Sequence, residues 1–378
     1  MKRHKFICFA TDHYNPLCVV RSLGQAGVKP IVIVVSKDPV LLCNSKYTAV
    51  LHRVDSYDDA YKLLVDKYGN EAQKPFLYAS NDRIIDTLDS HFDEIKDKFY
   101  LFNAGVQGRL HWLMNKDNIV SLAKEVGFRI PNSEVVDHGQ LPRTLNYPII
   151  TKTIMSIMGG WKNDVFICAN EKELKDAYKI IKTPKLILQE FIPKKTECCY
   201  EGFAANGGKD VYIPFQINYL RASKKSYGHY MSVEPLKDDG LRNKLYELIR
   251  RTRFEGIFDV EFLLGEDNVL YFLEVNFRST TWSYTMTKGG VNAPVLWAQA
   301  MLDGHIDQDK ICPLQDKFTA MTEPDDFAES VITHKVGLSQ WIKEFKGSKC
   351  RFYYDKDDPK PFFRYLLARI LRKLKMKK

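Results

Sequence analysis

Two short acidic segments near residue 270 carry residue types that bind a metal ion. The first contains Asp259 and Glu261, and the second contains Glu274, Asn276 and Arg278. Side chains alternate between the two faces of a strand, so each set shares one face, and the turn-like sequence between the segments predicts a hairpin. Oxygen ligands suit a hard cation such as Mg²⁺, which usually bridges to substrate phosphates. The pattern therefore predicts a magnesium site that serves phosphate chemistry.

These residues have an ordinary alternative, a surface strand whose acids pair with Arg278. Glu274, however, lies in a strongly apolar run, Leu270 to Phe277. Burying an unpaired carboxylate there costs roughly several kcal/mol, and a bound cation removes that cost. We therefore predict that a cation binds among the side-chain oxygens of Asp259, Glu261, Glu274 and Asn276.

Further polar residues upstream fall in an informative order. A lysine precedes a helix, a second lysine ends a strand, and a glycine-containing loop, a strand end and a single glutamate follow. In chain order these residues are Lys116, Lys152, Ser156 with Gly159 and Gly160, then Gln189, Glu190, Phe191 and Ile192, and then Glu197. Taken singly, each has an ordinary explanation as a surface lysine, a turn, a strand edge or a solvated charge. The order itself is the signal.

The first hundred residues contain the elements that must position such a site. Strands predicted at 5–10, 30–35, 76–79 and 100–103 alternate with helices predicted at 16–26, 56–68 and 82–98. This alternation predicts a parallel, doubly wound sheet, whose ligands lie beyond the carboxyl ends of the strands. Loops 11–15 and 80–82 occupy those ends, as ligand contacts or as ordinary helix caps. No G-x-G-x-x-G follows the first strand, which argues against a nicotinamide site.

The later parts of the chain differ from this first part. Helices are predicted at 110–127, 171–182, 237–253 and 292–302, among strands in antiparallel order, which is typical of an α+β domain. From residue 311 the pattern weakens until a helix at 359–378. We therefore predict a Rossmann-like domain at 1–110, a second domain at 111–310 and a basic C-terminal extension at 311–378.

Composition narrows the classes of function. The chain has 378 residues, 45% of them hydrophobic, and its eight cysteines form no C-x-x-C pair, which argues against zinc. The net charge of +9 comes from residues 360–378, which hold eight Lys or Arg and no acid, so that 48 basic residues face 47 acids elsewhere. A nearly neutral body argues against nucleic-acid binding. The start has no signal peptide pattern, and we expect a cytoplasmic protein with reduced thiols.

The order of these motifs resembles the ATP-grasp superfamily, in its carboxylate–amine ligase branch. The resemblance covers roughly residues 1–305, including the leading Rossmann-like domain that the family usually carries. Its strongest piece is the E-x-N-x-R strand from Glu274 to Arg278, with an acid thirteen residues upstream at Glu261. The fold it implies is an ATP-grasp fold, mixing α/β and α+β parts, behind a doubly wound domain.

The resemblance implies a site for ATP and Mg²⁺, with Mn²⁺ as a substitute. Its lysines would offset the phosphate charges, its glycine loop would cover the phosphates, its strand end would bind adenine and its glutamate the ribose. These ATP-contacting residues are Lys116, Lys152, Ser156, Gly159, Gly160, Gln189, Glu190, Phe191, Ile192 and Glu197. Glu261, Glu274 and Asn276 would hold the metal. The loop departs from the family pattern, since it lacks the expected proline.

The resemblance also implies a reaction. A small-molecule carboxylate would attack the γ-phosphate of ATP, and an amine would then attack the acyl phosphate to give an amide or peptide-like bond. Arg278 and Lys152 would act on the reacting phosphate, with Arg221 as a further candidate. Lys224, Lys225 and His229 would contact substrate or simply be solvated. Among related enzymes the layout is similar to D-aspartate-ligase-type enzymes, which act on cell-envelope precursors.

Other functions and one other surface stay open. A carboxylase or carbamoyl-phosphate-type enzyme would use bicarbonate as the acid, and a non-catalytic nucleotide-binding module would use no acid at all. The C-terminal helix, 359–378, carries Phe363, Leu366, Leu367, Ile370, Leu371 and Leu374 at helical spacing. It would lie on the inner face of an anionic membrane, or pack this stripe on the body. Neither substrate nor the oligomeric state follows from the sequence.

Overall fold

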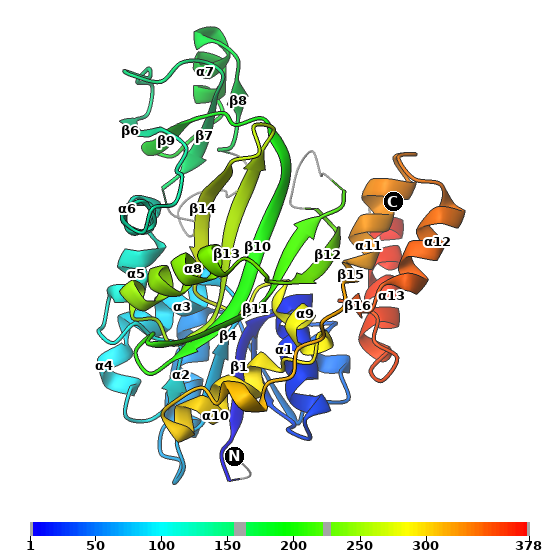
Figure 1. Ribbon diagram of the computed structural model, residues 1–378. Coiled ribbons are helices and arrows are strands. Elements are labelled where there is room, and N and C mark those ends of the chain that lie inside the picture. Colours follow the sequence, from blue (N-terminus) through cyan, green and yellow to red (C-terminus); the bar gives the residue numbers. More distant parts are fainter. Residues whose placement is uncertain (1–2, 155–163, 222–227, 376–378) are drawn as a thin grey trace.

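The computed structural model describes residues 3–154, 164–221 and 228–375 of the chain. Within these residues the strands form three sheets, of five, seven and four strands. In Figure 1 the N-terminal sheet and its helices form the base of the molecule, the four-stranded sheet lies at the opposite end, and the C-terminal helices lie at one side. No helix among the described residues is long and apolar enough to cross a membrane.

The N-terminal sheet is parallel, with strand order β3-β2-β1-β4-β5, as the alternation of strands and helices predicts. Its strands are β1 (Phe6–Thr11), β2 (Ile31–Val35), β3 (Val50–Val54), β4 (Phe76–Ala79) and β5 (Tyr100–Leu101). Its helices are α1 (Tyr14–Gln25), α2 (Tyr57–Tyr68), α3 (Asp82–Ser90) and α4 (Phe92–Ile95). The edge strand β3 was not predicted. Asn81 caps α3 by accepting the N–H of Ile84, so the cap interpretation of that residue is correct.

A small antiparallel sheet with strand order β6-β9-β7-β8 forms a separate lobe. Its elements are β6 (Ser133–Asp137), β7 (Ile149–Thr153), β8 (Ile167–Cys168), α7 (Glu171–Tyr178) and β9 (Lys185–Glu190). Leucine and isoleucine side chains from β7 and β9 pack against α7 in a core of their own. The lobe is joined to the N-terminal sheet through α5 (Arg109–Met114) and α6 (Lys116–Glu125).

The seven-stranded sheet forms the centre of the molecule, with strand order β14-β13-β10-β11-β12-β15-β16. Its first five strands are antiparallel neighbours. They are β10 (Lys194–Ala205), β11 (Asp210–Tyr219), β12 (Tyr230–Pro235), β13 (Gly256–Gly265) and β14 (Leu270–Asn276). Helices α8 (Asp239–Thr252), α9 (Ser283–Lys288) and α10 (Ala293–Asp303) pack around them. Trp297 of α10 is fully buried against Tyr78 and Phe102, so this helix joins the central sheet to the N-terminal sheet.

Two predicted helices are broken in the structure. The helix predicted at 82–98 ends at Ser90, and a short helix, α4, follows after His91. The helix predicted at 110–127 is interrupted at Asn115, whose extended backbone lets its side chain accept the N–H of Asp117. Because Asn115 caps α6, Lys116 becomes the first residue of that helix. The break therefore positions a predicted site residue.

The segment after residue 311 is joined to the body rather than appended to it. Strand β15 (Phe318–Met321) pairs with β12, and β16 (Cys350–Arg351) pairs with β15. Between and beyond them lie α11 (Glu323–Asp326), a π-helical turn at Phe327–Val331, α12 (Leu338–Gly347) and α13 (Lys360–Lys375). The weak sequence pattern concealed these strands. The domain limits at 110 and 310 stay a prediction, and this extension supplies two strands of the central sheet.

Candidate active site

The two acidic segments form the predicted hairpin, and their acids face one another. Strand β13 pairs with β14 so that Asp259 lies opposite Asn276 and Glu261 lies opposite Glu274. The Asn276 amide donates to Glu261 Oε1 at 2.8 Å. The register shifts between Glu261 and Phe262, which inserts Leu273 as an extra residue just before Glu274. Such a bulge turns a strand locally and is common beside active sites.

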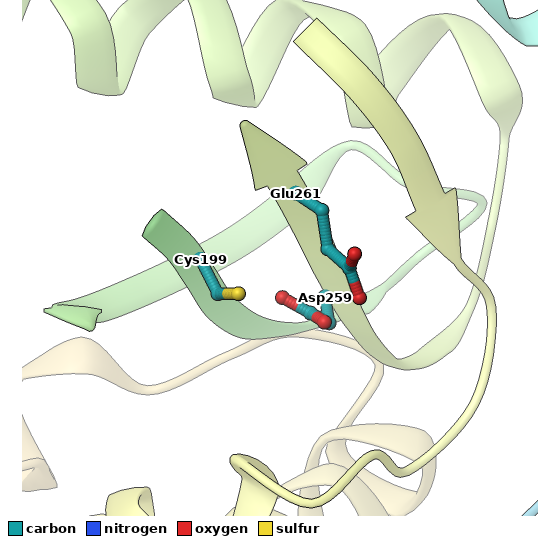
Figure 2. A group of neighbouring side chains, drawn as sticks. All are labelled: Cys199, Asp259 and Glu261. Atoms are coloured by element: carbon teal, nitrogen blue, oxygen red, sulfur yellow. The ribbon is translucent and has the colours of Figure 1, made fainter. Parts of the chain in front are cut away.

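The acids of this hairpin are crowded below the surface. Figure 2 shows Asp259 and Glu261 of β13 beside Cys199 of the neighbouring strand β10. The nearest ligand atoms of these three side chains all lie within 4.8 Å of one another. Burial, followed by the charges of Glu274 and Asp259, raises the pKa of Glu261 well above its usual range. Asp259 Oδ1 is buried and has no hydrogen-bond partner among the described residues. Carboxylates in this state favour a divalent cation as their partner.

The oxygen atoms of this group fit Mg²⁺ better than the sulfur does. Burial raises the pKa of the Cys199 thiol well above its ordinary value, so the sulfur stays protonated, and only a thiolate is a good metal ligand. The carboxylates of Asp259 and Glu261 remain as hard ligands in this group, and Asn276 and Glu274 lie opposite them on β14. The predicted ligand set is therefore brought together, and its role in binding metal stays a prediction.

Both predicted lysines reach the same place, Lys152 from strand β7 of the small lobe and Lys116 from the start of α6. Lys116 Nζ lies 3.2 Å from Glu274 Oε2, and the backbone N–H of Lys116 donates to Ile154 O at 3.3 Å. Lys152 Nζ donates to Gln189 Oε1 at 2.7 Å across the β7–β9 pair. Burial, followed by the charge of Lys116, lowers the pKa of Lys152 to about 8. Two cations this close favour a polyanion between them.

A cavity of about 140 Å³ lies between the small lobe and the acidic hairpin. It combines lysine and carboxylate side chains with a few apolar ones. Its lining residues are Lys116, Asp117, Val120, Ser133, Lys152, Ile187, Gln189, Glu261, Leu273 and Glu274. Apolar walls suit a flat base, and the charged end suits phosphates with a metal ion. The lining therefore suits a charged ligand better than an apolar one, and binding of a nucleotide here stays a prediction.

The predicted adenine-binding segment continues from this cavity at the end of β9. The carboxylate of Glu190 accepts the backbone N–H and the side-chain amide of Asn132, at 2.9 and 2.8 Å. The N–H groups of Glu190 and Phe191 donate to Asn132 O and Pro148 O. Those two groups are therefore already satisfied within the lobe. Ile192 ends this segment, and binding of adenine there stays a prediction.

Glu197, predicted to bind ribose, lies in β10 opposite Leu263 of β13. It forms an ion pair with Lys194 at 2.6 Å, and its side chain is 24% exposed. The negative charge of Glu197 contributes to the raised pKa of Glu261, and it partly offsets the lowering of the Lys152 pKa. Glu197 therefore belongs to the same charge cluster. A partly exposed acid in this charge cluster is compatible with the predicted contact.

Arg278 connects the acidic hairpin to the N-terminal sheet. Its guanidinium donates to Asp82 at 2.5 Å and to Asn276 Oδ1 at 3.0 Å. Asp82 begins α3 at the carboxyl end of β4, in the predicted loop 80–82. Burial and then the charge of Arg278 lower the pKa of His13, from loop 11–15, to about 4. Both N-terminal loops therefore converge on the arginine that was predicted to contact the reacting phosphate.

Two buried hydroxyls without hydrogen-bond partners lie at the same junction. Among the described residues, Ser80 Oγ and Ser279 Oγ have no partner, and the backbone N–H of Ser279 donates to Ala79 O at 3.4 Å. Thr281 donates to Asn15 Oδ1 at 3.0 Å. A buried polar atom without a partner is costly unless a ligand supplies one. The junction is therefore a candidate binding site for a second substrate.

Sequence reasoning missed one buried acid next to the hairpin. Glu201 of β10 lies opposite Asp259 and accepts hydrogen bonds from Thr280 and, at 3.1 Å, from Ser283. Burial raises the pKa of Glu201 to about 8. The signal was present, because Glu201 lies in the apolar run from Cys198 to Ala205, as Glu274 lies in its own.

Not all predicted site residues gather here. Arg221 forms bidentate hydrogen bonds with Asp326 at 3.1 Å and an ion pair with Glu344 at 2.7 Å. It lines a different cavity, with His229 and Asp326. Asp326 and Glu344 of the C-terminal segment thus bind Arg221. The structure does not bring Arg221 to the cavity between the small lobe and the acidic hairpin. Ser156, Gly159, Gly160, Lys224 and Lys225 lie outside the described residues.

Together, the parallel leading sheet, the small lobe and the antiparallel sheet with paired acids define the ATP-grasp fold. The comparisons with solved structures confirm it. N5-carboxyaminoimidazole synthetase from Staphylococcus aureus matches with a TM-score of 0.67 and 16% identity, over 88% of this chain and 86% of that one. L-amino acid ligase from Bacillus licheniformis matches with a TM-score of 0.63 and 14% identity, over 86% and 81%. At these identities the likeness shows the fold alone.

The curated relatives match only part of this chain, at low sequence identity. N5-carboxyaminoimidazole ribonucleotide synthase from Staphylococcus aureus strain MRSA252 is 28% identical over 166 residues, which is 43% of this chain and 43% of that enzyme. The chain thus aligns with less than half the length of this relative. No protein-family model matches the chain. These comparisons therefore do not identify the reaction of this protein.

Proposed function

We propose that this protein is an ADP-forming ATP-grasp enzyme that activates an acid with ATP and transfers it to an amine. The observation that carries the proposal is the cavity in which Lys116 and Lys152 face Glu261 and Glu274. Lys116 and Glu274 pair with each other, but Lys152 bonds the neutral Gln189 and Glu261 accepts from the neutral amide of Asn276. A triphosphate that brings its own metal ion would supply counter-charges to both.

The residues of the chain have distinct tasks in this proposal. Glu261, Glu274 and Asn276 would hold Mg²⁺, which supplies charge neutralisation to the phosphate oxygens when bound. Lys152, fixed by Gln189, would contact phosphate oxygens from the other wall. ATP would also compete with Glu274 for the Lys116 ammonium, which now lies 3.2 Å from that carboxylate. Catalysis would then consist of alignment and preset charges.

The acid and the amine would bind where Arg278 meets the N-terminal loops. Arg278 is held by Asp82 and Asn276, so its guanidinium is fixed beside the metal-binding strand. A fixed guanidinium suits the planar oxygens of a carboxylate or of an acyl phosphate. The unpartnered hydroxyls of Ser80 and Ser279 would supply further polar contacts. His13, neutral at pH 7 because of its low pKa, would accept or donate without adding charge.

For the acid we favour bicarbonate, with the carboxylate of an amino acid as the second candidate. The name of the curated relatives, N5-carboxyaminoimidazole ribonucleotide synthase, describes carboxylation of an amine nitrogen, and this supports bicarbonate. The structural likeness to an L-amino acid ligase supports the second candidate. Both acids would undergo the same steps: phosphorylation of a carboxylate oxygen with release of ADP, then attack of the amine with release of phosphate.

ADP release in carbonate-depleted buffer tests both the class and the acid. We expect bicarbonate to stimulate ADP release with ATP and Mg²⁺, and labelled bicarbonate to enter an amine acceptor. Glu261→Gln should abolish the stimulation, whereas Glu266→Gln, an exposed acid in the same hairpin, should not. Stimulation by amino acids instead would favour the second candidate. No stimulation by any acid, with no product trapped by hydroxylamine, would refute the proposed class.

A further inference from the structure

Helix α13 uses one of its faces to dock on the body of the protein. The Phe362 ring lies 5.6 Å from the Tyr354 ring, and the Tyr365 ring lies 4.7 Å from the Tyr353 ring. Arg369 adds an ion pair with Asp325 at 3.5 Å. The position of the helix is therefore set by one aromatic face, which leaves the opposite face of the helix free of these contacts.

The opposite face is apolar and open to solvent. The exposed fractions of its side chains are 59% for Phe363, 47% for Leu367, 56% for Ile370, 49% for Leu371 and 58% for Leu374. At about 100° per residue these five positions fall within an arc of roughly 100° on an ideal helix. We call these five residues the outer stripe. In a soluble helix such a stripe normally faces a core, whereas among the described residues the outer stripe is an exposed apolar surface open to a partner.

The charge around the outer stripe restricts what that partner can be. Arg364 and Arg372 are exposed on the same helix, and residues 360–378 carry eight Lys or Arg without any acid. The rest of the chain is nearly neutral, with 48 basic and 47 acidic residues. A symmetric contact between two copies of this helix would bring two basic segments together. An anionic, apolar surface matches both the stripe and the basic charge of the helix.

We propose that the outer stripe docks this protein on the surface of an anionic phospholipid bilayer. Its leucine, isoleucine and phenylalanine side chains would enter the boundary between headgroups and acyl chains, and Arg364, which lies next to the stripe on the helix, would contact anionic headgroups. The helix would lie in the plane of the membrane, with the Tyr353 and Tyr354 contacts holding the body above it. This inference is independent of the reaction proposed above.

Binding of the full chain to lipid vesicles tests the proposal. We expect it to cosediment with phosphatidylcholine vesicles that contain phosphatidylserine, and to bind pure phosphatidylcholine and high-salt samples at least about tenfold more weakly. Leu367→Glu combined with Ile370→Glu should weaken binding to the anionic vesicles by at least about tenfold. The control combines Val106→Glu and Ile180→Glu, which change the same charge at positions 61% and 57% exposed, and it should bind like the unaltered protein.

Three outcomes would overturn the proposal. The first is equal vesicle binding by the stripe variant, its control and the unaltered protein. The second is no binding of the unaltered protein to anionic vesicles. The third is a dimer, seen by light scattering, that the stripe substitutions dissociate without any vesicle binding, which would assign the stripe to a second copy. Since all four substituted positions are exposed, unchanged thermal unfolding midpoints are expected and would exclude misfolding as the cause.

Discussion

Two groups of buried charges in this protein are built in opposite ways. Around Arg21, which is fully buried, each part of the guanidinium has a partner within the chain. Its Nε donates to Asp358 Oδ2 at 3.1 Å, and its two Nη atoms donate to the carbonyls of Phe352, Tyr353 and Asp358 at 2.8–3.0 Å. The Ser45 hydroxyl and the backbone N–H of Lys46 donate further hydrogen bonds to the Asp358 carboxylate.

The acidic hairpin lacks such balance. Asp259, Glu261 and Glu201 are like charges packed side by side, and burial raises the pKa of each. A charge group that satisfies itself acts as a structural anchor, and here it ties the segment 350–358 to α1. A charge group that needs a ligand to balance it is suited to be a binding site, because the bound ligand offsets the free-energy cost of burying unpaired charges. Both groups bury charged side chains, and they differ in whether opposite charges and hydrogen-bond partners within the chain balance them.

Substitution of the anchor should have the largest effect on stability. Asp358→Asn leaves the buried Arg21 without its counter-charge, and we expect the free energy of unfolding to fall by about 3–5 kcal/mol. Denaturant unfolding measures this fall. Asp357→Asn, at an exposed neighbour, is the matched control and should change stability little. If Asp358→Asn unfolds like the unaltered protein, the distinction between the two groups fails.

Substitution in the hairpin should reverse the pattern, with a large loss of activity and no loss of stability. Glu274→Gln removes a metal ligand in our proposal, and we expect ADP formation to fall at least about 100-fold, or about 2.7 kcal/mol. The stabilisation of the unaltered protein by Mg²⁺ with ATP, measured as a thermal shift, should be lost. The unfolding midpoint without ligand should stay equal or rise, since one like charge has gone.

A retained rate of ADP formation in Glu274→Gln would exclude this residue from the metal site. A lower midpoint without ligand would instead show that its ion pair with Lys116 stabilises the fold. In that case the hairpin would resemble the Arg21 anchor.

The hairpin could be predicted from the sequence because its signals are local. Asp259 and Glu261 alternate with apolar residues over five positions, and a turn joins them to Glu274 and Asn276. The doubly wound sheet was predictable for the same reason, from helices and strands of regular spacing. In such segments side-chain periodicity alone decides which residues share a face.

Contacts between distant segments could not be predicted in this way. Arg278 and Asp82 are 196 residues apart, and no local pattern links them. Strand β16 has only two residues, so its pairing with β15, and not its own sequence, makes it a strand. Arg221 was placed with the phosphate because of its position in the chain, whereas the acids Asp326 and Glu344, more than 100 residues later, bind it.

The smallest predicted effect concerns Glu201 and pH. Its pKa is raised to about 8 in the folded protein, above the ordinary value of about 4.3 expected in the unfolded chain. As the pH rises from about 5 to 8, the unfolded chain releases this proton while the folded protein keeps it, so the free energy of unfolding falls. Glu201→Gln cannot ionise and keeps an acceptor for Thr280. We therefore expect it to exceed the unaltered protein in stability at pH 8 by at least about 1 kcal/mol.

Denaturant unfolding of both proteins at pH 5, 6.5 and 8 measures this difference, which should grow with pH. The control is Glu255→Gln, which replaces a partly exposed acid just before β13. It should show no such trend. A constant difference across the three pH values would mean that Glu201 is already ionised and paired in the folded protein. Glu201 would then be paired by other groups of the chain, as Asp358 is. Only the acids of the hairpin would remain in the group that needs a ligand.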